Sequence, residues 1–561
     1  MMAALVQSNP RTGDLGGNME FLVAAVQRAA AADAELCLAP EMALCGPNAG
    51  DILLRTGFVE ECREVLNAAA LRLAEGRNPP LLLGAPVSNP VPTGKSLQSG
   101  AVLLHEGRVR VLGRKILLPS GGIHDEAGYF EPGVACGVLS LKGWRFCVTL
   151  GEDAWNEESA HIGRRLFSRD PVADFFSAGG ADCLINLCAR PYEQGRVAPH
   201  EQLLARLAER YRIPVLAVNM VGGNDSLVYY GGSLALDNLG RYNGRAEFFA
   251  EDLLLADLSG KRPATRLDPA TGEAAPCPEE PERLRPEEEL WRAVVLGLGD
   301  FVRKCGFGRA LLGLSGGADS ALVAALAAEA LGPENVAALL MPASGFGEEG
   351  MEDALALARN LGVSSHVLPV SPLLDAFERL FGQNFAGGLS GFPGKNTLAR
   401  IRGALLMAYA NCFDAMLLAT VDKSEAAVGR ATLYGDLCGG IAPIGDLYKD
   451  QVRALCRHYN RKHPGAIPEA ILRKTPSTEG ALGRGDGDPL SSAVLDPLLR
   501  DILEGRENLQ GLVRRGHDPA AARQAEILVR KSEFKRRQSP PALHLTARGF
   551  GGGMRIPVAS V

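Results

Sequence analysis

A glycine-rich loop in the second half of the chain has the residues needed to hold phosphate. Residues 315–320 read SGGADS and join an apolar, strand-like run to a segment of helical period. The glycines allow the backbone to approach a ligand closely, and free N–H groups with the serine hydroxyls can donate to phosphate oxygens. Asp319 would repel phosphate unless a cation lay between them, so it indicates Mg²⁺. The loop lacks the Gly-Lys-Ser/Thr ending of a Walker motif, and a plain glycine turn with a Ser/Asp helix cap is the alternative.

A second stretch, in the first half, ends an apolar run in two acids. Residues 147–155 read CVTLGEDAW, with Glu152 and Asp153 directly after the run. Acids at the end of a buried strand are typical of a reaction centre, but the residue at the turn is Gly151, which has no side chain. The stretch therefore indicates either a site that works through its acids or a site that has lost its reactive atom.

The elements that must position these residues form two parts. Up to residue 258, short apolar runs alternate with Ala/Leu/Arg-rich stretches of helical period, which predicts a layered α/β domain. Residues 259–286 are rich in proline and charge and are expected to form a linker. In residues 287–561 strand and helix patterns alternate again, and their spacing predicts a doubly wound parallel sheet. Two large domains also suit a chain of 561 residues.

The amino-acid composition limits the kinds of molecule that the protein is expected to bind. The net charge of −6 gives no general attraction to nucleic acid or to an anionic membrane. The basic run at 530–538 is typical of a solvated helix face or of a nucleic-acid patch, but the acidic overall balance and the adjacent SPP turn favour a loop that closes on the substrate. We expect no signal peptide, no membrane span and a cytoplasmic protein. The 12 cysteines contain no C-x-x-C pair and are expected to be reduced thiols.

The SGGADS loop begins a series of motifs that resembles the synthetase domain of NAD synthetases, which belong to the N-type ATP pyrophosphatases. The resemblance covers about residues 287–561. Five further motifs follow the loop in order: KNTLARIRGALLMAYAN (395–411), LLATVDKSEAAVGRATLYGD (417–436), APIGDLYKDQV (442–452), TPSTEGALGRGDGDPLSSAVLD (475–496) and SEFKRRQSPP (532–541).

The resemblance implies a role for individual residues. ATP, the co-substrate, would be bound by Ser315, Gly316, Gly317, Asp319, Ser320, Thr420, Lys449 and Ser477. Deamido-NAD would be bound by Asn396, Glu425, Arg430, Ala431, Thr432, Leu433, Asp436 and Lys535. Asp319 and Glu425 would hold Mg²⁺. In the implied reaction a nicotinate carboxylate attacks the α-phosphate of ATP and releases pyrophosphate, and ammonia then displaces AMP. Metal and lysine charges would stabilise the phosphoryl-transfer transition state.

Lys395, Asp422 and Arg430 are among several departures from that family's pattern, and Lys395 and Arg430 lie near the expected substrate pocket. Lys395 stands where Glu is usual, Asp422 where Asn is usual, and Arg430 where Tyr is usual. The added positive charge of Lys395 and Arg430 would either tune the affinity for a polyanionic dinucleotide or indicate a different carboxylate substrate.

The first 258 residues resemble the nitrilase-like glutaminase domain of glutamine-dependent NAD synthetases. LAPEMALCG contributes Glu41, and GRKILLPSGGIHDEAGYFEPG contributes Lys115 and Glu126. In that family a cysteine thiolate attacks the glutamine amide, with Glu as base and Lys stabilising the oxyanion. The cysteine belongs to a Cys-Glu-Asp-x-Trp motif, and here its position is occupied by Gly151.

Other positions of this domain agree with a loss of glutaminase activity. Cys147 lies four residues upstream on the strand, roughly 13 Å away, and is expected to be a buried apolar residue rather than a replacement nucleophile. Pro47 stands where the family usually has Tyr, and Arg190 where it has Ser. Glu41 and Lys115 are expected to persist as a buried ion pair that supports the fold.

These observations favour an NAD synthetase that amidates deamido-NAD with free ammonia and carries an inactive glutaminase domain. Three alternatives stay open: an ATP-dependent amide ligase for another carboxylate, a residual glutamine-dependent enzyme, and a non-catalytic regulatory homologue. The resemblance also implies a homo-oligomer, either a dimer of synthetase domains or a larger assembly.

Overall fold

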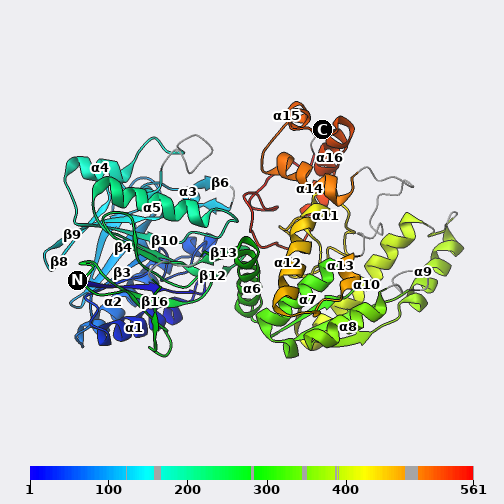
Figure 1. The fold of residues 1–561 in the computed structure, drawn as a ribbon, viewed down its shortest axis with the longest axis horizontal. Coiled ribbons are helices and arrows are strands. Elements are labelled where there is room, and N and C mark those ends of the chain that lie inside the picture. The colour runs from blue at the N-terminus through cyan, green and yellow to red at the C-terminus, as the bar shows by residue number, and fades with distance from the viewer. Residues whose placement is uncertain are drawn as a thin grey trace. The chain divides into compact units, whose positions relative to one another are not determined.

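The structure is a computed structural model, which describes every residue except 122, 157–165, 279–282, 344–349, 386, 387, 390, 474–489, 560 and 561. The chain forms two compact units, coloured along the sequence in Figure 1. Unit 1 consists of Met1–Asn224 and Val228–Leu284, and unit 2 of Asp225–Leu227 and Arg285–Val561. None of the helices among the described residues is long and apolar enough to cross a membrane.

Unit 1 contains two large mixed sheets. The eight-stranded sheet has the order β18-β17-β16-β1-β2-β3-β4-β5. Its strands are β1 (Met2–Gln7), β2 (Leu36–Leu38), β3 (Leu81–Ser88), β4 (Leu97–His105), β5 (Arg108–Arg114), β16 (Asp252–Asp257), β17 (Thr265–Leu267) and β18 (Ala274–Pro276). The six-stranded sheet has the order β15-β14-β11-β10-β9-β8. Its strands are β8 (Gly137–Leu141), β9 (Trp144–Leu150), β10 (Cys183–Cys188), β11 (Val215–Asn219), β14 (Leu234–Leu236) and β15 (Tyr242–Arg245).

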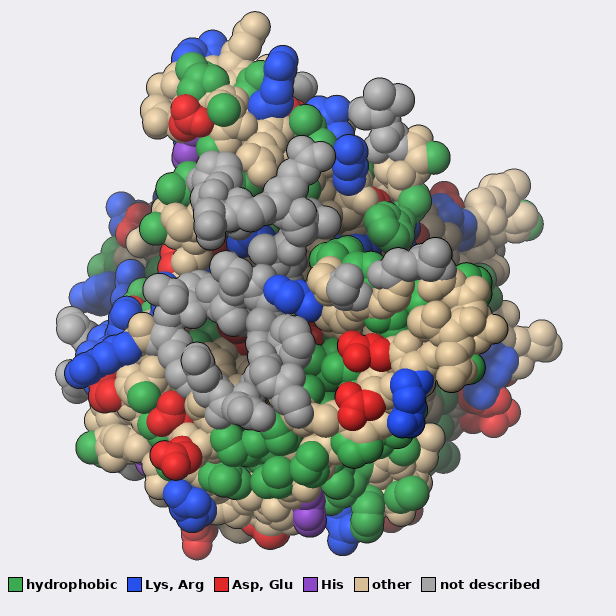
Figure 2. Space-filling view, turned by 90° about the vertical axis from the view of Figure 1, so that its right-hand side faces the viewer, with side chains coloured by type: hydrophobic (Ala, Val, Ile, Leu, Met, Phe, Trp, Pro, Cys, Tyr) green, Lys and Arg blue, Asp and Glu red, His purple; other side chains and the backbone are tan. Residues whose placement is uncertain are grey.

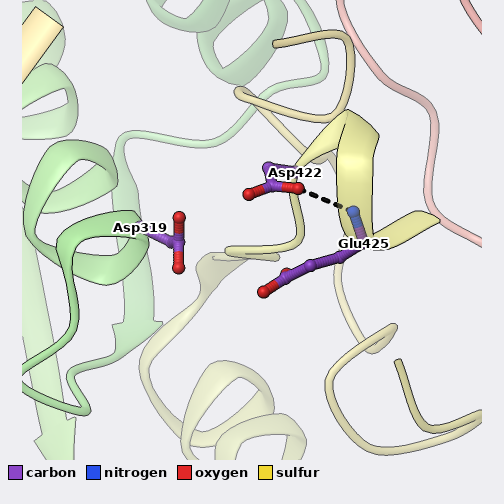
Figure 3. Close-up of side chains that lie close together, drawn as sticks. All are labelled: Asp319, Asp422 and Glu425. Carbon is purple, nitrogen blue, oxygen red and sulfur yellow. Dashed lines mark hydrogen bonds between the residues drawn. The ribbon is translucent and has the colours of Figure 1, made fainter. Parts of the chain in front are cut away.

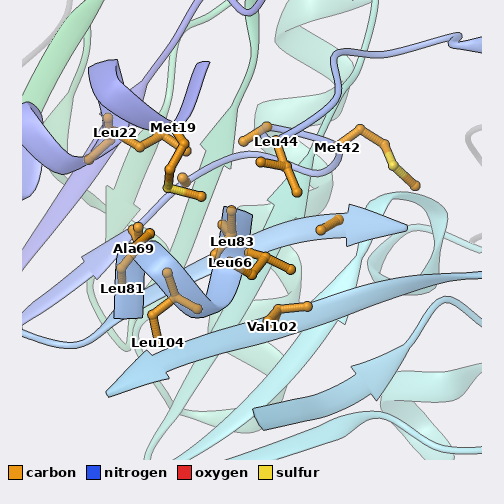
Figure 4. Packing of buried hydrophobic residues seen from close by; sticks show 14 of the residues in the cluster. Met19, Leu22, Met42, Leu44, Leu66, Ala69, Leu81, Leu83, Val102 and Leu104 are labelled. Carbon is orange, nitrogen blue, oxygen red and sulfur yellow. The ribbon is translucent and has the colours of Figure 1, made fainter. Parts of the chain in front are cut away.

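Helices cover the outer faces of the two sheets. Successive side chains of a strand point to opposite faces, so Val6 of β1 packs toward α1 (Leu15–Ala31) and α2 (Phe58–Ala74), whereas Leu5 packs toward the other sheet. Figure 4 shows part of the helix-facing cluster. On the other sheet, α4 (Pro171–Ala178) and α5 (Val197–Tyr211) pack against β9, β10 and β11. The layered α/β domain predicted from the sequence is therefore confirmed as a helix–sheet–sheet–helix sandwich.

Smaller elements of unit 1 lie in the connections between these layers. They are β6 (Ser120–Gly121), β7 (His124–Asp125), β12 (Val221–Asn224), β13 (Leu227–Tyr230), α3 (Glu126–Tyr129) and the 3₁₀ turns η1 (Gly50–Leu54) and η2 (Gly151–Ala154).

The segment 259–286, which we expected to be a linker, is partly folded into unit 1. β17 pairs with β16 and β18 pairs with β17, both antiparallel, so they extend the eight-stranded sheet at one edge. An edge strand such as β18 tolerates proline and charge because one side of its backbone lacks a ladder partner. The proline and charge content therefore concealed two short strands, of which β18 forms the edge of the sheet.

Unit 2 is built on a four-stranded parallel sheet of order β21-β20-β19-β22. The strands are β19 (Arg309–Gly313), β20 (Val336–Leu340), β21 (Ser364–Val367) and β22 (Ala415–Leu418). The sequence patterns predict β19, β20 and β21 as strands alternating with helices, and the doubly wound parallel sheet is confirmed. The sheet changes winding direction between β19 and β22, where ligands of such folds bind.

The helices of unit 2 pack around this sheet and extend beyond it. They are α6 (Pro286–Lys304), α7 (Ala318–Leu331), α8 (Met351–Leu361), α9 (Ser371–Asn384), α10 (Phe392–Phe413), α11 (Lys423–Val428), α12 (Lys449–Lys462), α13 (Glu469–Arg473), α14 (Ser492–Leu503), α15 (Leu509–Arg514), α16 (Pro519–Lys531) and α17 (Glu533–Arg536), with the 3₁₀ turn η4 (Pro333–Asn335) before β20. Beyond the sheet, buried apolar residues of α11, α14 and α16 pack together in one cluster.

Candidate functional site

The SGGADS loop of unit 2 connects β19 to α7 at the carboxyl end of the sheet. Gly316 has φ +76°, and a β-carbon there would lie 2.7 Å from the carbonyl oxygen of Gly350, so only glycine fits without rearrangement. The hydroxyls of Ser315 and Ser320 are 3.1 Å apart, and Ser315 Oγ accepts from the N–H of Gly317 at 3.3 Å. The loop thus forms a turn whose amides and hydroxyls gather at the start of α7, as phosphate binding requires.

Three carboxylates meet beside this loop, as Figure 3 shows. Asp319 lies in the first turn of α7, Asp422 is the N-cap of α11, and Glu425 lies in the first turn of α11. One oxygen from each lies within 4.8 Å of the others. The sequence analysis predicted that Asp319 and Glu425 hold one Mg²⁺ ion, and the structure brings their carboxylates close together. The sequence did not assign Asp422 to the cluster, although its departure from the usual Asn was a signal.

Lys449, the first residue of α12, extends its ammonium group into the carboxylate cluster. Its Nζ lies 2.9 Å from Asp319 Oδ1, 2.6 Å from Asp422 Oδ2 and 3.0 Å from Glu425 Oε1. Burial opposes its charge, but the three carboxylates raise the pKa of Lys449 above its ordinary value. Burial raises the pKa of the Asp422 carboxyl to about 7, and burial together with the other two carboxylates raises that of Glu425 well above its usual range.

The donor set fits a hard divalent cation. Carboxylate oxygens are the ligands that Mg²⁺ prefers, and Asp319 and Glu425 are the partly exposed members, with 24% and 31% of their side chains accessible. Asp319 belongs to the phosphate loop and Glu425 lies beside it, so a cation bound to both would neutralise the repulsion between Asp319 and a polyphosphate.

The residues expected to bind a dinucleotide form a second group around α10 and the segment after α11. Thr432 Oγ1 donates to Asn396 Oδ1 at 2.8 Å, and Asp436 Oδ2 accepts from the N–H of Thr432 at 3.2 Å. Arg400, which was not expected from the sequence, donates from Nε to the carbonyl of Leu433 at 3.2 Å. The structure therefore brings these predicted residues together, and Arg400 adds a cation that lies one helical turn after Asn396.

Two further cations of this group are held by backbone carbonyls. Lys535 Nζ donates to the carbonyls of Gly429 and Ala431, both at 2.8 Å, and burial lowers its pKa. Arg430 Nη2 donates to the carbonyl of Leu490 at 3.1 Å. Lys535 thus lies beside the expected pocket and braces the segment that contains Arg430 and Ala431.

Two other expected ATP-binding residues are not among the contacts described above. Thr420 lies two residues after β22, at the carboxyl end of the sheet near the switch point. Ser477 lies outside the described residues.

In unit 1, Gly151 marks the end of β9 and begins the turn η2. Its φ is +45°, in the left-handed region. A β-carbon at this position would lie 2.7 Å from both Glu41 Oε2 and Lys115 Nζ. A side chain here would therefore point directly between the Glu and the Lys, the place where a nucleophile would need to be. Because the residue is glycine, Glu41 and Lys115 fill that space themselves.

The Glu41–Lys115 pair belongs to a larger buried cluster. Lys115 Nζ lies 3.1 Å from Glu41 Oε1, 2.6 Å from Glu126 Oε2 and 2.7 Å from Glu152 Oε2. The lysine and Glu41 are buried, whereas Glu126 and Glu152 are partly exposed. Burial raises the pKa of Glu41, Lys115 lowers it, and Glu126 and Glu152 raise it, which together bring it to about 8. A buried pair was expected, but the structure shows one cation shared by three carboxylates.

Asp153, next in the motif, positions Lys115. Its buried carboxylate accepts the N–H groups of Ile116 at 3.0 Å and Leu117 at 2.7 Å, which fixes the backbone directly after the lysine. Burial raises the pKa of Asp153 to about 7. The acid pair of the motif therefore has two roles: Glu152 binds the ammonium of Lys115, and Asp153 holds its main chain.

The other departures in unit 1 have structural consequences. The guanidinium of Arg190 lies 5.1 Å from the centre of the Trp155 ring, so a cation stacks on the motif's tryptophan. Pro47 is buried, and its carbonyl accepts from Thr12 Oγ1 at 3.2 Å. Cys147 packs in the apolar cluster between the six-stranded sheet and its helices, and the neighbouring Cys136 together with burial raises the pKa of its thiol. A buried, protonated thiol is a poor nucleophile.

Comparison with known proteins identifies both units. Residues 2–265 match the carbon-nitrogen hydrolase family, and residues 290–539 match the NAD synthase family. The chain is 40% identical to the glutamine-dependent NAD(+) synthetase of Synechocystis sp., covering 99% of this chain and 98% of that protein. The chain belongs to the glutamine-dependent NAD(+) synthetase family. It is therefore a ligase that forms carbon–nitrogen bonds.

Other proteins with this name match the chain over nearly its whole length, and the solved structures among them have the same fold. The enzyme of Thermotoga maritima is 33% identical over 100% of this chain and 98% of its own. The glutamine-dependent NAD⁺ synthetase of Acinetobacter baumannii, solved in complex with ADP, is 29% identical with a TM-score of 0.75, covering 99% of this chain and 98% of that one. A protein of the same name from Cytophaga hutchinsonii shares the fold, with a TM-score of 0.79 at 21% identity and coverage of 100% and 97%.

Proposed function

We propose that this family member makes NAD⁺ from deamido-NAD, ATP and free ammonia, and that its glutaminase unit is inactive. The observation that carries the proposal is Gly151, whose missing side chain would point between Glu41 Oε2 and Lys115 Nζ. Covalent glutaminase chemistry needs a nucleophile next to its base and oxyanion-stabilising group, and this position has none. Unit 2, by contrast, combines a phosphate loop, a carboxylate cluster and a lysine.

The proposed reaction has two steps. The nicotinate carboxylate oxygen attacks the α-phosphorus of ATP, and the bond to the β-phosphate breaks to release pyrophosphate. Ammonia then attacks the activated carbonyl carbon, AMP leaves with the shared oxygen, and a proton is lost to give the amide. Mg²⁺ held by Asp319 and Glu425 would supply charge stabilisation at the phosphates, and Lys449 and the loop amides would hold the polyphosphate.

The test compares two nitrogen donors in the full-length protein. Initial rates of NAD⁺ formation are measured with deamido-NAD, ATP and Mg²⁺, with either ammonium or glutamine. We expect turnover with ammonium and, with glutamine, only the rate that contaminating ammonia supports. Glutamine-dependent turnover above that control would contradict the inactive-glutaminase proposal. ATP cleavage to AMP with ammonium and a different carboxylate, without NAD⁺ formation, would indicate another substrate.

We predict that Gly151→Cys does not restore glutamine use. The new β-carbon would lie within 2.7 Å of two buried charged groups and would adopt φ +45°, which is strained for a side-chain-bearing residue. A displacement of about 1 Å in a catalytic group can cost about 100-fold in rate, so we expect glutamine-dependent NAD⁺ formation to stay at least about 100-fold below the ammonium-dependent rate. Gly180→Cys controls for an added thiol, because a β-carbon at that glycine would have nothing within 4 Å. Efficient glutamine use by Gly151→Cys alone would show an intact pocket.

We also propose that unit 2 associates with a second copy of itself. Helix α9 has no buried residue, and its apolar side chains recur at helical spacing on one face, with Leu373, Phe377, Leu380 and Phe381 accessible by 43%, 51%, 64% and 38%. Phe413 of α10 adds a further apolar side chain that is 50% exposed. Figure 2 views this side of the molecule, and hydrophobic side chains gather on it. A self-complementary two-fold interface would bury such a face.

Light scattering after gel filtration tests this association. We expect the protein to elute as a dimer or a larger even-numbered assembly, and Leu380→Glu to lower the molar mass by at least half. Val134→Glu, at an 82% exposed position of unit 1, should leave the mass unchanged. A monomeric parent protein, or an unaltered Leu380→Glu variant, would contradict this proposal.

A further inference from the structure

The carboxylate cluster of unit 2 is arranged in layers from the interior outward. Asp422 is fully buried, Lys449 is 7% exposed, and Asp319 and Glu425 are 24% and 31% exposed. The shortest of the three lysine contacts, 2.6 Å, is the innermost one, to Asp422. Lys449 therefore lies between one deep carboxylate and two outer ones.

Both oxygens of Asp422 already have partners. Oδ1 accepts the backbone N–H of Glu425 at 2.8 Å, which caps α11, and Oδ2 pairs with Lys449. Binding a metal ion directly would require Asp422 to give up the helix cap or the ion pair, both inside the protein. The outer oxygens of Asp319 and Glu425 can reach a metal without breaking backbone hydrogen bonds. The geometry thus separates two ligands from one carboxylate that holds the lysine.

We propose that Asp422 is a positioning residue. It neutralises the charge of Lys449 and holds the ammonium group in place when a divalent cation binds to Asp319 and Glu425. This inference rests on the proposed function of the site, and it assigns a role to a residue outside the expected ligand set. Without metal, the ammonium group donates hydrogen bonds to Asp319 and Glu425 and forms an ion pair with Asp422 Oδ2 at 2.6 Å. With metal, the contact to Asp422 persists and the other two N–H groups are released toward the polyphosphate.

Charge balance supports this division of roles. When all three carboxylates are ionised, as metal binding requires, Asp422 and Lys449 together are neutral, and the two remaining carboxylates carry −2 and match one divalent cation. If residue 422 were neutral, the charge of Lys449 would be balanced only by Asp319 and Glu425. The lysine would then compete with the metal for the same oxygens. Asp422 therefore favours metal binding although it does not touch the metal.

Metal binding without substrates tests the inference independently of NAD⁺ formation. The probe is Mn²⁺ alone, titrated into the full-length protein and followed by the electron paramagnetic resonance of free Mn²⁺. The variants are Asp422→Asn, in which an asparagine can still cap α11, Lys449→Met, and the double variant. Asp450→Asn is the matched control, because it removes the same charge from the first turn of α12 at a residue that pairs with Arg500. Thermal unfolding of each variant confirms that it is folded.

We expect Asp422→Asn to raise the Mn²⁺ dissociation constant about tenfold or more, because an uncompensated cation then lies within about 4 Å of the metal position. The double variant should return to within about threefold of the parent, since the competing ammonium is gone. Asp450→Asn should bind like the parent protein.

Three outcomes would overturn the inference. A double variant as weak as Asp422→Asn would make Asp422 a direct ligand. An unchanged affinity of Asp422→Asn would make its role structural only. A parent protein that does not bind Mn²⁺ would show that Asp319 and Glu425 are no metal site in the free enzyme. Because no deamido-NAD or ammonia is present, none of these results depends on which amide the enzyme makes.

Discussion

Replacing Glu425 by glutamine is expected to lower ammonium-dependent NAD⁺ formation by about 100-fold or more. The substitution removes one of the two outer charges proposed to hold Mg²⁺ and one of the three partners of Lys449. It leaves the backbone N–H of residue 425 free to donate to Asp422, so α11 keeps its cap. The measurement is the initial rate of NAD⁺ formation and of pyrophosphate release at saturating ATP and Mg²⁺. A parallel loss of both products would locate the defect in the adenylation step.

The matched control for this prediction is Glu469→Gln on α13, whose side chain is 68% exposed. It makes the same chemical change in unit 2 but away from the cluster, and its rate should match that of the parent protein. Removing Mg²⁺ with a chelator should abolish both products in the parent protein. An active Glu425→Gln variant, or activity in excess chelator, would contradict the proposed metal site.

Replacing Lys115 by methionine is expected to destabilise the protein by about 3–5 kcal/mol, because three carboxylates lose the cation that they share. The matched variant, Glu41→Gln, should have a much smaller effect, since Lys115 keeps Glu126 and Glu152. Thermal unfolding of the full chain, with hydrogen exchange of β9 to locate the change in unit 1, measures both. Equal destabilisation by the two variants would contradict the shared-cation arrangement.

The same cluster predicts how stability depends on pH. Burial raises the pKa of Glu41 from 4.5 to about 8, so between these values the folded protein holds a proton that the unfolded chain releases. This stabilising contribution is complete below pH 4.5 and is lost as the pH rises through about 8. The Glu41→Gln variant has no carboxyl group to titrate, so it does not lose stability in this way. The difference between its melting temperature and that of the parent protein should therefore increase as the pH rises from 4.5 to about 8. A constant difference would show that Glu41 is ionised throughout.

Much of unit 2 could be predicted from the sequence because the residues that specify its main motif lie close together in the chain. The SGGADS loop, the strand before it and the helix after it are adjacent in the sequence, and backbone preferences of glycine and helix caps act over a few residues. The resemblance implied that Asn396 and Thr432 line the same pocket, and the structure places them in hydrogen-bond contact. Arg400 was missed because its contact is to a backbone carbonyl, which any residue at position 433 would supply.

Strands β17 and β18 were missed for a different reason. Their residues carry the proline and charge that usually indicate a linker, and only the pairing of β17 with β16 and of β18 with β17 makes them strands. Strand formation depends on pairing with a neighbouring strand rather than on local residue preferences alone, and a position at or near the edge removes the need for a continuous apolar pattern.

The sequence by itself determined that residue 151 has no reactive atom, because the chemistry of a side chain does not depend on the fold. It also predicted residues of unit 2 that could bind phosphate and metal. Only the tertiary structure decided where the charges meet: Lys115 among three glutamates, and Lys449 between Asp422 and the two outer carboxylates. These groups come from segments far apart in the chain. Coulomb interactions depend on their separation in space and on burial, and folding alone establishes both.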